Sequence, residues 1–461
     1  YHYLRQPDVL EQFRSACSQP EGSAQLPWDL LIVDEAHNLM PSNFGDDSDL
    51  SQMLRAISPW FEHKLFLTAT PHNGHTRCFS GLLEQLDPVR FTQTSEFTDA
   101  VKQRISEVVV RRLKREINQL DEQAGRTPRF CDRIPQPIPL YFGVEEKRLS
   151  AAFAEFRAAV KSAIASSRRT EQIAAFFAIE VLNKRLLSCP YTFAHSWHRF
   201  KAGIEQEDSA ELAEVQAARR ATLEDLDDDR EVEGRLQHAA KTTGAWFKPL
   251  LSRLTAEVAS IDVALEELGL ISQHEDFLPT PEADERWERL LKEIKKYLRN
   301  GNEWVKENRL VIFTEYKTTL DYLERRLKEI FKKDPKAIRV LFGGMSDTQR
   351  EEIKQAFNDP NDQIRILVAT DAASEGLNLQ ETAHLVLHYD IPWNPARLDQ
   401  RNGRLDRHGQ ARDVIVFHFT SEDDADLKFL GHVVSKVNTI REELGSMGEV
   451  FDAAFRRRFT D

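Results

Sequence analysis

Short apolar runs followed by polar segments mark both ends of the chain, and a helical pattern fills its middle. Near the N-terminus these runs are Leu30–Val33 and Lys64–Leu67. The others lie toward the C-terminus, at Leu310–Phe313, Ile338–Phe342, Ile364–Val368, His384–His388 and Val414–Phe417. A short, mostly apolar run is typical of a strand buried on both faces of a parallel sheet, because helices cover both sides. The pattern therefore predicts two α/β regions.

The segment between these regions is predicted to be helical. From Val144 to about Asn300 apolar residues recur with a helical period, as in the alanine-rich runs Ala151–Ile164 and Ile173–Leu187. Before this segment, the proline-rich run Ile134–Pro139 is expected to break regular structure and to mark a boundary.

Two further helices are predicted in the C-terminal region. Ser346 and Gln349 have the spacing of a capping box, which predicts a helix that ends at Phe357. The last periodic stretch, Asp424–Leu444, predicts an amphipathic terminal helix.

Composition limits the class of protein. A length of 461 residues suggests roughly three domains at about 150 residues each. Charged residues make up 30% and hydrophobic residues 41%, and no apolar run approaches the ~20 residues that span a bilayer. The four cysteines have no CxxC spacing, so we expect reduced thiols in a cytoplasmic protein without a membrane partner. The net charge of −13 includes an acidic segment at Glu224–Glu233 and does not exclude a local basic face for nucleic acid.

Two pairs of charged residues indicate the chemistry. Asp34 and Glu35 follow the run Leu30–Val33, so we expect them at the C-terminal end of a buried strand. Carboxylates in that position suit Mg²⁺ and an attacking water. Arg404 and Arg407 are one helical turn apart, so on a helix they would share a face and converge on one anion, such as the transferring phosphate of a triphosphate.

Motifs in a definite order surround these two pairs. They are Val33–His37, Leu67–Pro71, Val311–Thr314, Ala369–Gln380, Trp393–Pro395 and Gln400–Gln410. In sequence and order they resemble superfamily-two helicase-like ATPases, and within them the Swi/Snf-type DNA translocases. Thr370-Asp371 departs from the usual Swi/Snf threonine-arginine pattern toward the general superfamily form.

The resemblance implies an α/β fold of two RecA-like parallel-sheet lobes with a helical insertion between them. We expect the C-terminal part of an incomplete first lobe at residues 1–130 and the helical insertion at 131–300. The second lobe, with its terminal helix, is expected at 301–461.

The resemblance also assigns roles to individual residues. Glu35, Asp34, Arg404 and Arg407 are expected to be catalytic, with Asp34 holding Mg²⁺ through water. ATP binding adds His37, Glu375, Gly376 and Gln400. Nucleic-acid contact and coupling are expected from Thr68, Thr70, Thr314, Thr370 and Asn378. The implied ligands are ATP, Mg²⁺ and double-stranded DNA.

The sequence lacks GxxxxGK[ST], the loop whose backbone amides cradle phosphates. The segment Lys241–Gly244 contains Lys-Thr but no glycine loop. Only 33 residues precede Asp34, too few for the loop and its following strands. We therefore expect a fragment that begins midway through the first lobe and that alone hydrolyses ATP poorly or not at all.

Three interpretations of the function remain open at this stage. The first is an ATP-dependent translocase on double-stranded DNA. Details at Thr70–Arg77 and Val108–Arg115 are similar to bacterial phage-defence (DISARM-type) helicase-like subunits, which would add other subunits of a defence complex as partners. The alternatives are a strand-separating DNA or RNA helicase and a non-enzymatic DNA-binding scaffold.

Overall fold

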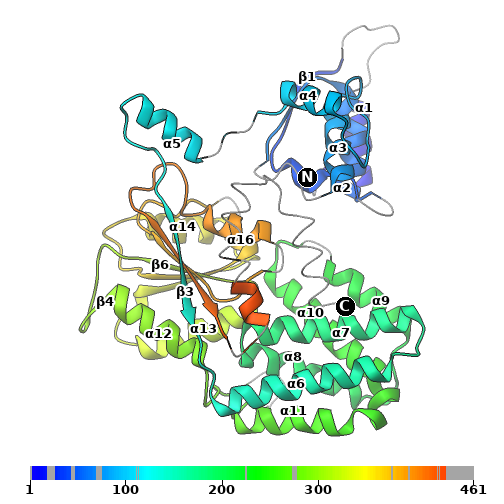
Figure 1. Cartoon of the computed structure of the whole chain (residues 1–461), viewed down its shortest axis with the longest axis vertical. Coiled ribbons are helices and arrows are strands. Elements are labelled where there is room, and N and C mark those ends of the chain that lie inside the picture. The colour runs from blue at the N-terminus through cyan, green and yellow to red at the C-terminus, as the bar shows by residue number, and fades with distance from the viewer. Residues whose placement is uncertain are drawn as a thin grey trace. The chain divides into compact units, whose positions relative to one another are not determined.

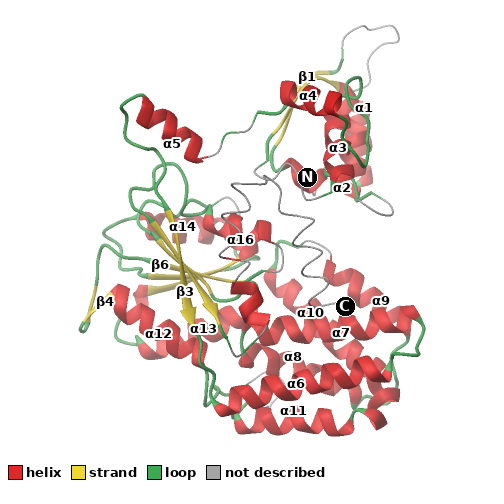
Figure 2. Ribbon diagram, in the orientation of Figure 1, coloured by secondary structure: helices red, strands yellow, loops and turns green. Residues whose placement is uncertain are grey.

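The computed structural model describes most of the chain, in two compact units that divide after Glu116 (Figures 1 and 2). The described residues are 3–17, 26–42, 47–68, 75–110, 112, 114–223, 226–271, 278–374, 377–392, 395–422, 424, 426–431 and 434. Most of the predicted terminal helix Asp424–Leu444 lies outside them.

The first unit contains two parallel strands, β1 (Trp28–Val33) and β2 (Phe61–Phe66), as the apolar runs predicted. Its helices are α1 (Pro7–Ala16), the 3-10 helix Ala36–Leu39, α2 (Asp49–Ile57), the 3-10 helix Ser58–Trp60, α3 (Thr76–Leu86), α4 (Asp99–Val108) and the start of α5 (Lys114–Gln123). The core joins the end of β1 to α2 and α3 through residues such as Val33, Leu54 and Leu82.

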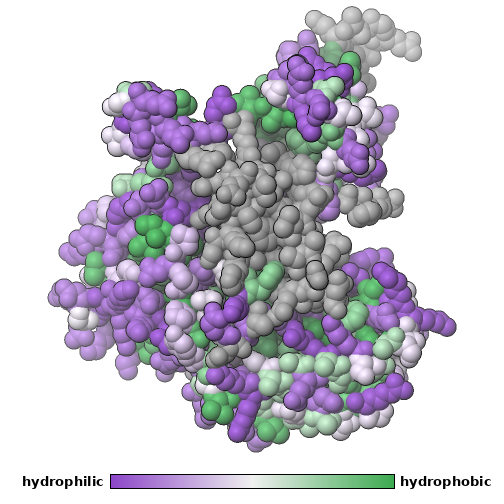
Figure 3. All heavy atoms as spheres, in the orientation of Figure 1, coloured by the Kyte–Doolittle hydropathy of each residue, from purple (hydrophilic) through white to green (hydrophobic). Residues whose placement is uncertain are grey.

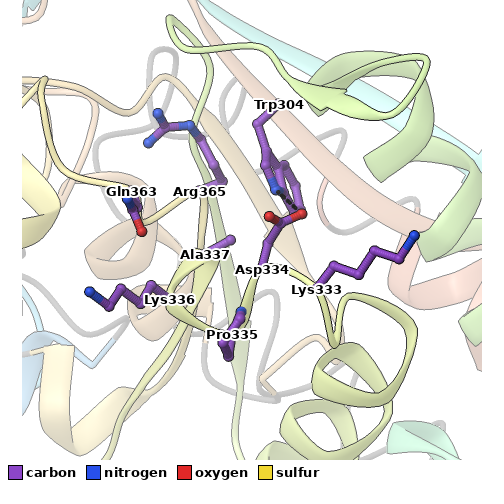
Figure 4. A pocket seen from close by; sticks show the side chains of 8 residues that line it. All are labelled: Trp304, Lys333, Asp334, Pro335, Lys336, Ala337, Gln363 and Arg365. Atoms are coloured by element: carbon purple, nitrogen blue, oxygen red, sulfur yellow. Dashed lines mark hydrogen bonds between the residues drawn. The ribbon is translucent and has the colours of Figure 1, made fainter.

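Both strands of the first unit also expose apolar side chains. Leu30 and Ile32 of β1 are 50% and 57% exposed, and Leu65 of β2 is 48% exposed. Figure 3 shows apolar residues gathered beside these strands. The expectation that Leu30–Val33 is a buried strand is therefore wrong, because Val33 is the one residue of β1 that is buried.

The second unit is built on a six-stranded parallel sheet in the order β3-β10-β9-β6-β8-β7. Its strands are β3 (Arg133–Pro139), β6 (Leu310–Thr314), β7 (Ile338–Leu341), β8 (Ile366–Thr370), β9 (Leu385–His388) and β10 (Val414–Thr420). Every residue of β6, β8 and β9 is buried, which agrees with their unbroken apolar sequences. The predicted strands of the C-terminal region are therefore confirmed.

The prediction that Ile134–Pro139 breaks regular structure is wrong, because this run forms strand β3 at the edge of the sheet. Leu140 donates its N–H to Thr420 and Asp132 accepts from Val414, so the even-numbered positions of β3 face β10. The three prolines occupy odd positions, so their backbone nitrogens face the open edge of the sheet, where no N–H donor is needed. The sheet of the second unit therefore begins within the segment that was assigned to the helical insertion.

Helices pack beside this sheet and around it. Those of the insertion are α6 (Val144–Ala163), α7 (Arg169–Ser188), α8 (Pro190–Ile204), α9 (Leu212–Leu223), α10 (Asp229–Phe247), the 3-10 helix Lys248–Arg253, α11 (Thr255–Glu267) and α12 (Glu285–Leu298). After the short hairpin of β4 (Arg299–Asn300) and β5 (Glu303–Trp304) come α13 (Lys317–Ile330), the 3-10 helix Pro335–Ala337, α14 (Asp347–Asn358), α15 (Asp371–Ser374) and α16 (Pro395–Asn402). The capping box at Ser346 and Gln349 is confirmed at the start of α14.

The insertion has its own aromatic core, in which Phe156 contacts Trp197, Phe200 and Phe247. Helices α8 and α10 approach closely where Gly244 faces the Phe200 carbonyl oxygen, since a Cβ at Gly244 would lie 1.9 Å from that atom. The segment Lys241–Gly244 is therefore part of a helix-packing contact and not a phosphate loop. No helix among the described residues is long and apolar enough to cross a membrane.

Candidate functional site

In each unit the candidate residues lie where parallel strands end. The carboxyl ends of parallel strands share one edge of a sheet, which is where α/β proteins place ligand-binding loops. In the first unit Asp34 follows β1 and Thr68 follows β2. In the second unit Thr314 ends β6 and Thr370 ends β8.

The acidic motif of the first unit is a short hydrogen-bonded turn. The backbone N–H of Glu35 donates to Asp34 Oδ1 at 2.9 Å. The ring of His37 lies with Nδ1 3.3 Å from Glu35 Oε2 and 3.1 Å from the hydroxyl oxygen of Thr68. The sequence-predicted residues Asp34, Glu35, His37 and Thr68 are therefore brought together within this unit.

The backbone at Glu35 is left-handed, with φ 45°. Among the residues that the structure describes, Glu35 is the only non-glycine residue with a positive φ. Such a conformation costs a side-chain-bearing residue about 1–2 kcal/mol. Strain of this kind is found at sites where side-chain direction matters more than stability.

Burial and charge act in opposite directions on His37. Burial lowers the pKa of His37, while the carboxylate of Glu35 raises it, and the net direction is downward. A neutral ring can exchange a hydrogen bond with the Thr68 hydroxyl. His37 therefore links the end of β1 to the end of β2.

Asp34 and Glu35 also fit the metal that the motif implies. Asp34 is exposed, whereas Glu35 Oε2 is buried beside His37 although the Glu35 side chain as a whole is 47% exposed, so Asp34 offers the accessible carboxylate. Oxygen donors of this kind are the ligands that Mg²⁺ prefers, usually with several waters retained. Bound there, Mg²⁺ would neutralise the negative charge of a polyphosphate.

Asp390, which follows β9, is the centre of a buried network at the sheet edge of the second unit. Its Oδ2 accepts hydrogen bonds from the hydroxyls of Thr314 at 2.6 Å and Ser188 at 2.9 Å. Its Oδ1 accepts from the backbone N–H of Glu315 at 2.8 Å. Because Ser188 ends α7, this carboxylate joins the helical insertion to strands β6 and β9.

Arg401 of α16 binds the same network from the other side. Its guanidinium forms two hydrogen bonds with Asp371, through Nε at 2.5 Å and Nη2 at 2.9 Å. Nη1 donates to the Asp390 carbonyl oxygen at 2.7 Å, and Nη2 lies 3.5 Å from its carboxylate. Although burial alone would lower the pKa of Arg401, the carboxylate of Asp371 and its neighbours raise it, so the guanidinium stays charged.

The expectation that Arg404 and Arg407 share one face of a helix is wrong. Helix α16 ends at Asn402, and both arginines lie in the turns that follow. Arg407 donates to the Asn378 side chain, and the Arg404 carbonyl accepts from the N–H of Leu379. The two arginines are therefore held against the segment after β8 by its backbone and side chains.

Other contacts fix the end of α16. Arg133 of β3 pairs with Asp399 at 3.0 Å and with Asp406, one carboxylate on each side of the helix end. His388 Nε2 lies 2.9 Å from the Asn402 side-chain oxygen, and burial lowers the pKa of His388 well below its ordinary value. The edge strand β3 thus helps position the arginine segment, which comprises Gln400–Gln410.

Two of the predicted nucleic-acid residues have hydroxyls that are already occupied. Thr314 and Thr370 are both fully buried. Thr314 donates to Asp390, and Thr370 donates to Asp229 of α10 at 2.5 Å. In this conformation neither hydroxyl is available to a phosphate, because each is bonded to a buried carboxylate.

The remaining predicted residues have different outcomes. Gln400 lies half-buried in α16, one turn before Arg404. Thr70, Glu375 and Gly376 lie outside the described residues.

Sequence reasoning missed several residues that organise the site, namely Arg133, Asp229, Asp390 and Arg401. A signal existed for Asp390, because it follows an apolar run as Asp34 does. Arg401 was read as part of the arginine motif without a role of its own. The partners of Arg133 and Asp229 are more than 100 positions away along the chain, and no local pattern indicates them.

Comparisons with known proteins agree with these motifs. The SNF2-related domain family matches residues 2–125, and the helicase conserved C-terminal domain family matches residues 287–409. The uncharacterized ATP-dependent helicase YqhH of Bacillus subtilis (strain 168) is 23% identical over 429 residues, covering 92% of this chain. The chain spans about 61% of the length of that relative.

Two solved structures are also similar to the chain. The C-terminal part of the Fun30 ATPase domain has a TM-score of 0.37 and 14% identity, covering 70% of this chain and 97% of its own. The Pyrococcus furiosus Hef helicase domain has a TM-score of 0.42 and 16% identity, covering 93% of this chain and 77% of its own.

The two family matches and the ordered strand-end motifs are similar to those of the helicase-like ATPases of superfamily two. Within that superfamily, the match of residues 2–125 to the SNF2-related domain makes this part of the chain similar to the Swi/Snf-type proteins.

Proposed function

We propose that the natural protein containing this chain is an ATP-dependent translocase on double-stranded DNA. The observation that carries the proposal is the pair of strand-end sites, one acidic in the first unit and one rich in arginine in the second, in a chain of the Swi/Snf type. Acidic groups suit Mg²⁺ and water activation, and arginines suit the charge of a transferring phosphoryl group.

The role proposed for each residue is the one that the resemblance to Swi/Snf-type motors implies. Asp34 holds Mg²⁺ through water, and Glu35 orients the attacking water. His37 senses the nucleotide and passes its state to Thr68 through their shared hydrogen bond. Arg404 and Arg407, with Gln400, Glu375 and Gly376, contact the phosphates and ribose.

Coupling to DNA is proposed to run through the buried network of the second unit. Arg401 and Asp390 tie the arginine segment to β6, β8 and β9, and Ser188 extends the network into the helical insertion. A shift of the arginine segment on hydrolysis would therefore move the strand-end loops together. Asn378, which holds Arg407, belongs to one of these loops.

The direct test is ATP hydrolysis with and without duplex DNA, using the natural protein that contains this chain. Duplex should stimulate turnover, and Arg407→Ala should reduce it about 10³-fold if this residue is an arginine finger. Arg397→Ala is the matched control, because Arg397 is an exposed arginine in α16, just before the arginine segment. Equal turnover in Arg407→Ala and Arg397→Ala would contradict the assignment.

A second test separates translocation from strand separation. Triplex displacement without unwinding of a forked duplex is the expected result for a Swi/Snf-type translocase. Efficient unwinding with no triplex displacement would place the protein among strand-separating helicases. Duplex binding without ATP turnover would identify a DNA-binding scaffold.

The biological setting we propose is bacterial phage defence, with other subunits of a defence complex as partners. The support is the sequence around Thr70–Arg77 and Val108–Arg115, part of which lies outside the described residues. Phage plating on cells with and without the gene tests this setting. Equal plating efficiency across a panel of phages would contradict it.

A further inference from the structure

The acidic start of α10 lies against hydrogen-bond donors at the strand-end edge of the second unit. The Asp229 carboxylate accepts hydrogen bonds from the Thr370 hydroxyl and from the backbone N–H of Gly343, which follows β7. The Asp229 N–H donates back to the Gly343 carbonyl at 3.3 Å. One carboxylate thus occupies donors from two neighbouring strands of the sheet.

The preceding residue, Asp228, closes the same contact. A methyl group built on Gly344 would lie 2.5 Å from Cγ and from both carboxylate oxygens of Asp228. Gly344 also has φ +87°, a conformation that side-chain-bearing residues rarely adopt. Gly343 and Gly344 therefore form a cradle that admits two carboxylates from the insertion.

The cradle holds negative charge with neutral donors. Burial raises the pKa of Asp229, and the nearby carboxylates of Asp371 and Asp228 raise it further. The interactions that favour its charged form are the hydrogen bonds from Thr370 and Gly343. Backbone amides and hydroxyls are the donors that proteins commonly offer to nucleic-acid phosphates.

A second contact of the same helix differs, because it is an ion pair between two charged side chains. Glu233, one turn further along α10, accepts two hydrogen bonds from Arg185 of α7 at 3.0 and 2.8 Å. Burial would raise the pKa of Glu233, but Arg185 lowers it overall. Helix α10 is therefore attached to α7 by a paired charge, and Asp229 is not needed for that attachment.

We propose that Asp228 and Asp229 stand in for backbone phosphates of duplex DNA and compete with the duplex for the donors of Gly343 and Thr370. The inference rests on the proposed DNA-binding function and adds a regulatory contact to it. In the absence of DNA the two carboxylates fill the cradle. Duplex DNA binds fully only when the first turn of α10 leaves it.

The experiment measures duplex affinity of the whole chain at fixed salt for wild type, Asp229→Asn and the double variant Asp228→Asn/Asp229→Asn. Asparagine keeps the shape and the helix-capping ability of aspartate while removing the charge. A hydrogen bond to a charged acceptor is stronger than one to a neutral acceptor by an amount that corresponds to about tenfold in binding. We therefore expect up to about tenfold tighter duplex binding.

Glu231→Gln is the matched control. Glu231 lies in the same first turn, pairs with Arg235 at 3.0 Å and has a 56% exposed side chain. The substitution Glu231→Gln removes one negative charge without changing the cradle, so it should change duplex affinity less than about twofold. Hydrogen exchange gives a second readout, because duplex should speed exchange in the first turn of α10 in the wild type.

The outcomes are distinguishable. Two results together support the inference. The aspartate variants alone bind duplex more tightly, and duplex speeds hydrogen exchange in the first turn of α10 of the wild type. Unchanged or weaker binding by variants that melt at the wild-type temperature overturns it, and so does an equal gain from Glu231→Gln. If the aspartate variants unfold, the wild type still decides: hydrogen exchange in the first turn of α10 that is unchanged or slower on adding duplex overturns the inference. No duplex binding by any protein would overturn the proposed function and this inference together.

Discussion

Replacing Arg401 should destabilise the second unit more than its position near the end of an eight-residue helix would indicate. Arg401 is 1% exposed, forms two hydrogen bonds with Asp371 and donates to the carbonyl of Asp390. Arg401→Met removes the positive charge and leaves two carboxylates without their cation.

The magnitude follows from the surroundings of those carboxylates. Breaking a buried pair by removing one partner costs about 3–5 kcal/mol. Asp390 keeps its hydrogen bonds from Thr314, Ser188 and the Glu315 N–H, and the Asp371 side chain is 17% exposed to water. We therefore expect the low end of that range, about 3 kcal/mol, for Arg401→Met. Arg401→Lys keeps the charge but not the two-pronged geometry, and should cost about 1–2 kcal/mol.

Thermal and urea unfolding of the chain measure these differences. At about 2 °C per kcal/mol for a unit of this size, Arg401→Met should lower the melting temperature by about 6 °C. Arg397→Met is the matched control on α16, because its side chain is 44% exposed and 3.9 Å from Glu315. Although Glu315 is only 23% exposed, a pair at this long distance, with its arginine in water, should contribute less than about 1 kcal/mol.

A double-mutant cycle with Asp371→Asn isolates the pair. If Arg401 and Asp371 stabilise each other as the contacts indicate, their coupling energy should exceed about 1 kcal/mol. A coupling energy near zero, or equal losses from Arg401→Met and Arg397→Met, would refute the reasoning.

Three further predictions concern the acidic motif, the helical insertion and the response to pH. In the natural protein Glu35→Gln should abolish ATP turnover while preserving ATP binding, because it removes the proposed water-orienting carboxylate and leaves Asp34. Comparable turnover of mutant and wild type would show that Glu35 has no part in the mechanism. Gly244→Ala should cost about 3 kcal/mol of unfolding free energy because its Cβ would lie 1.9 Å from the Phe200 carbonyl oxygen. Gly234→Ala, on the same helix with nothing within 4 Å, should instead stabilise by up to about 1 kcal/mol, and the reverse order in urea denaturation would contradict the packing. Burial lowers the pKa of His418 from 6.5 to about 4, so the unfolded chain binds a proton more readily, and stability present above pH 6.5 is lost as the pH falls toward 4. The loss from His418 is about 2 kcal/mol at pH 5, and a His418→Gln variant with an unchanged pH slope between 6.5 and 4 would show that another group is responsible.

Local sequence patterns predicted the strands of both units well. The runs Leu310–Phe313 and Ile364–Val368 became β6 and β8 with small shifts at their ends. These strands are predictable because a buried parallel strand must be apolar on both faces, which leaves an unbroken signature. The strand-end position of Asp34 and Glu35 followed from the same signature.

Prediction failed where the partner was distant in sequence. Strand β3 pairs with β10, and Ile134 lies beside Ile415. Its prolines locally indicate a break in regular structure. A strand accepts them only when their nitrogens face an edge without a neighbouring strand, and the local sequence does not show which edge is paired. Likewise the arginine motif predicted a continuous helix, but α16 ends at Asn402.

The sequence by itself determined the two α/β regions, the helical segment between them and the types of residue at the strand ends. Periodicity and motif spacing are local properties, and the chemistry of carboxylates and arginines does not depend on the fold. Only the tertiary structure decided which donors those residues meet. It placed Asp229 on Thr370 and Arg401 on Asp371. Because a buried charge requires a partner that the chain supplies from far away, such pairings exist only once the sheet and the insertion have packed together.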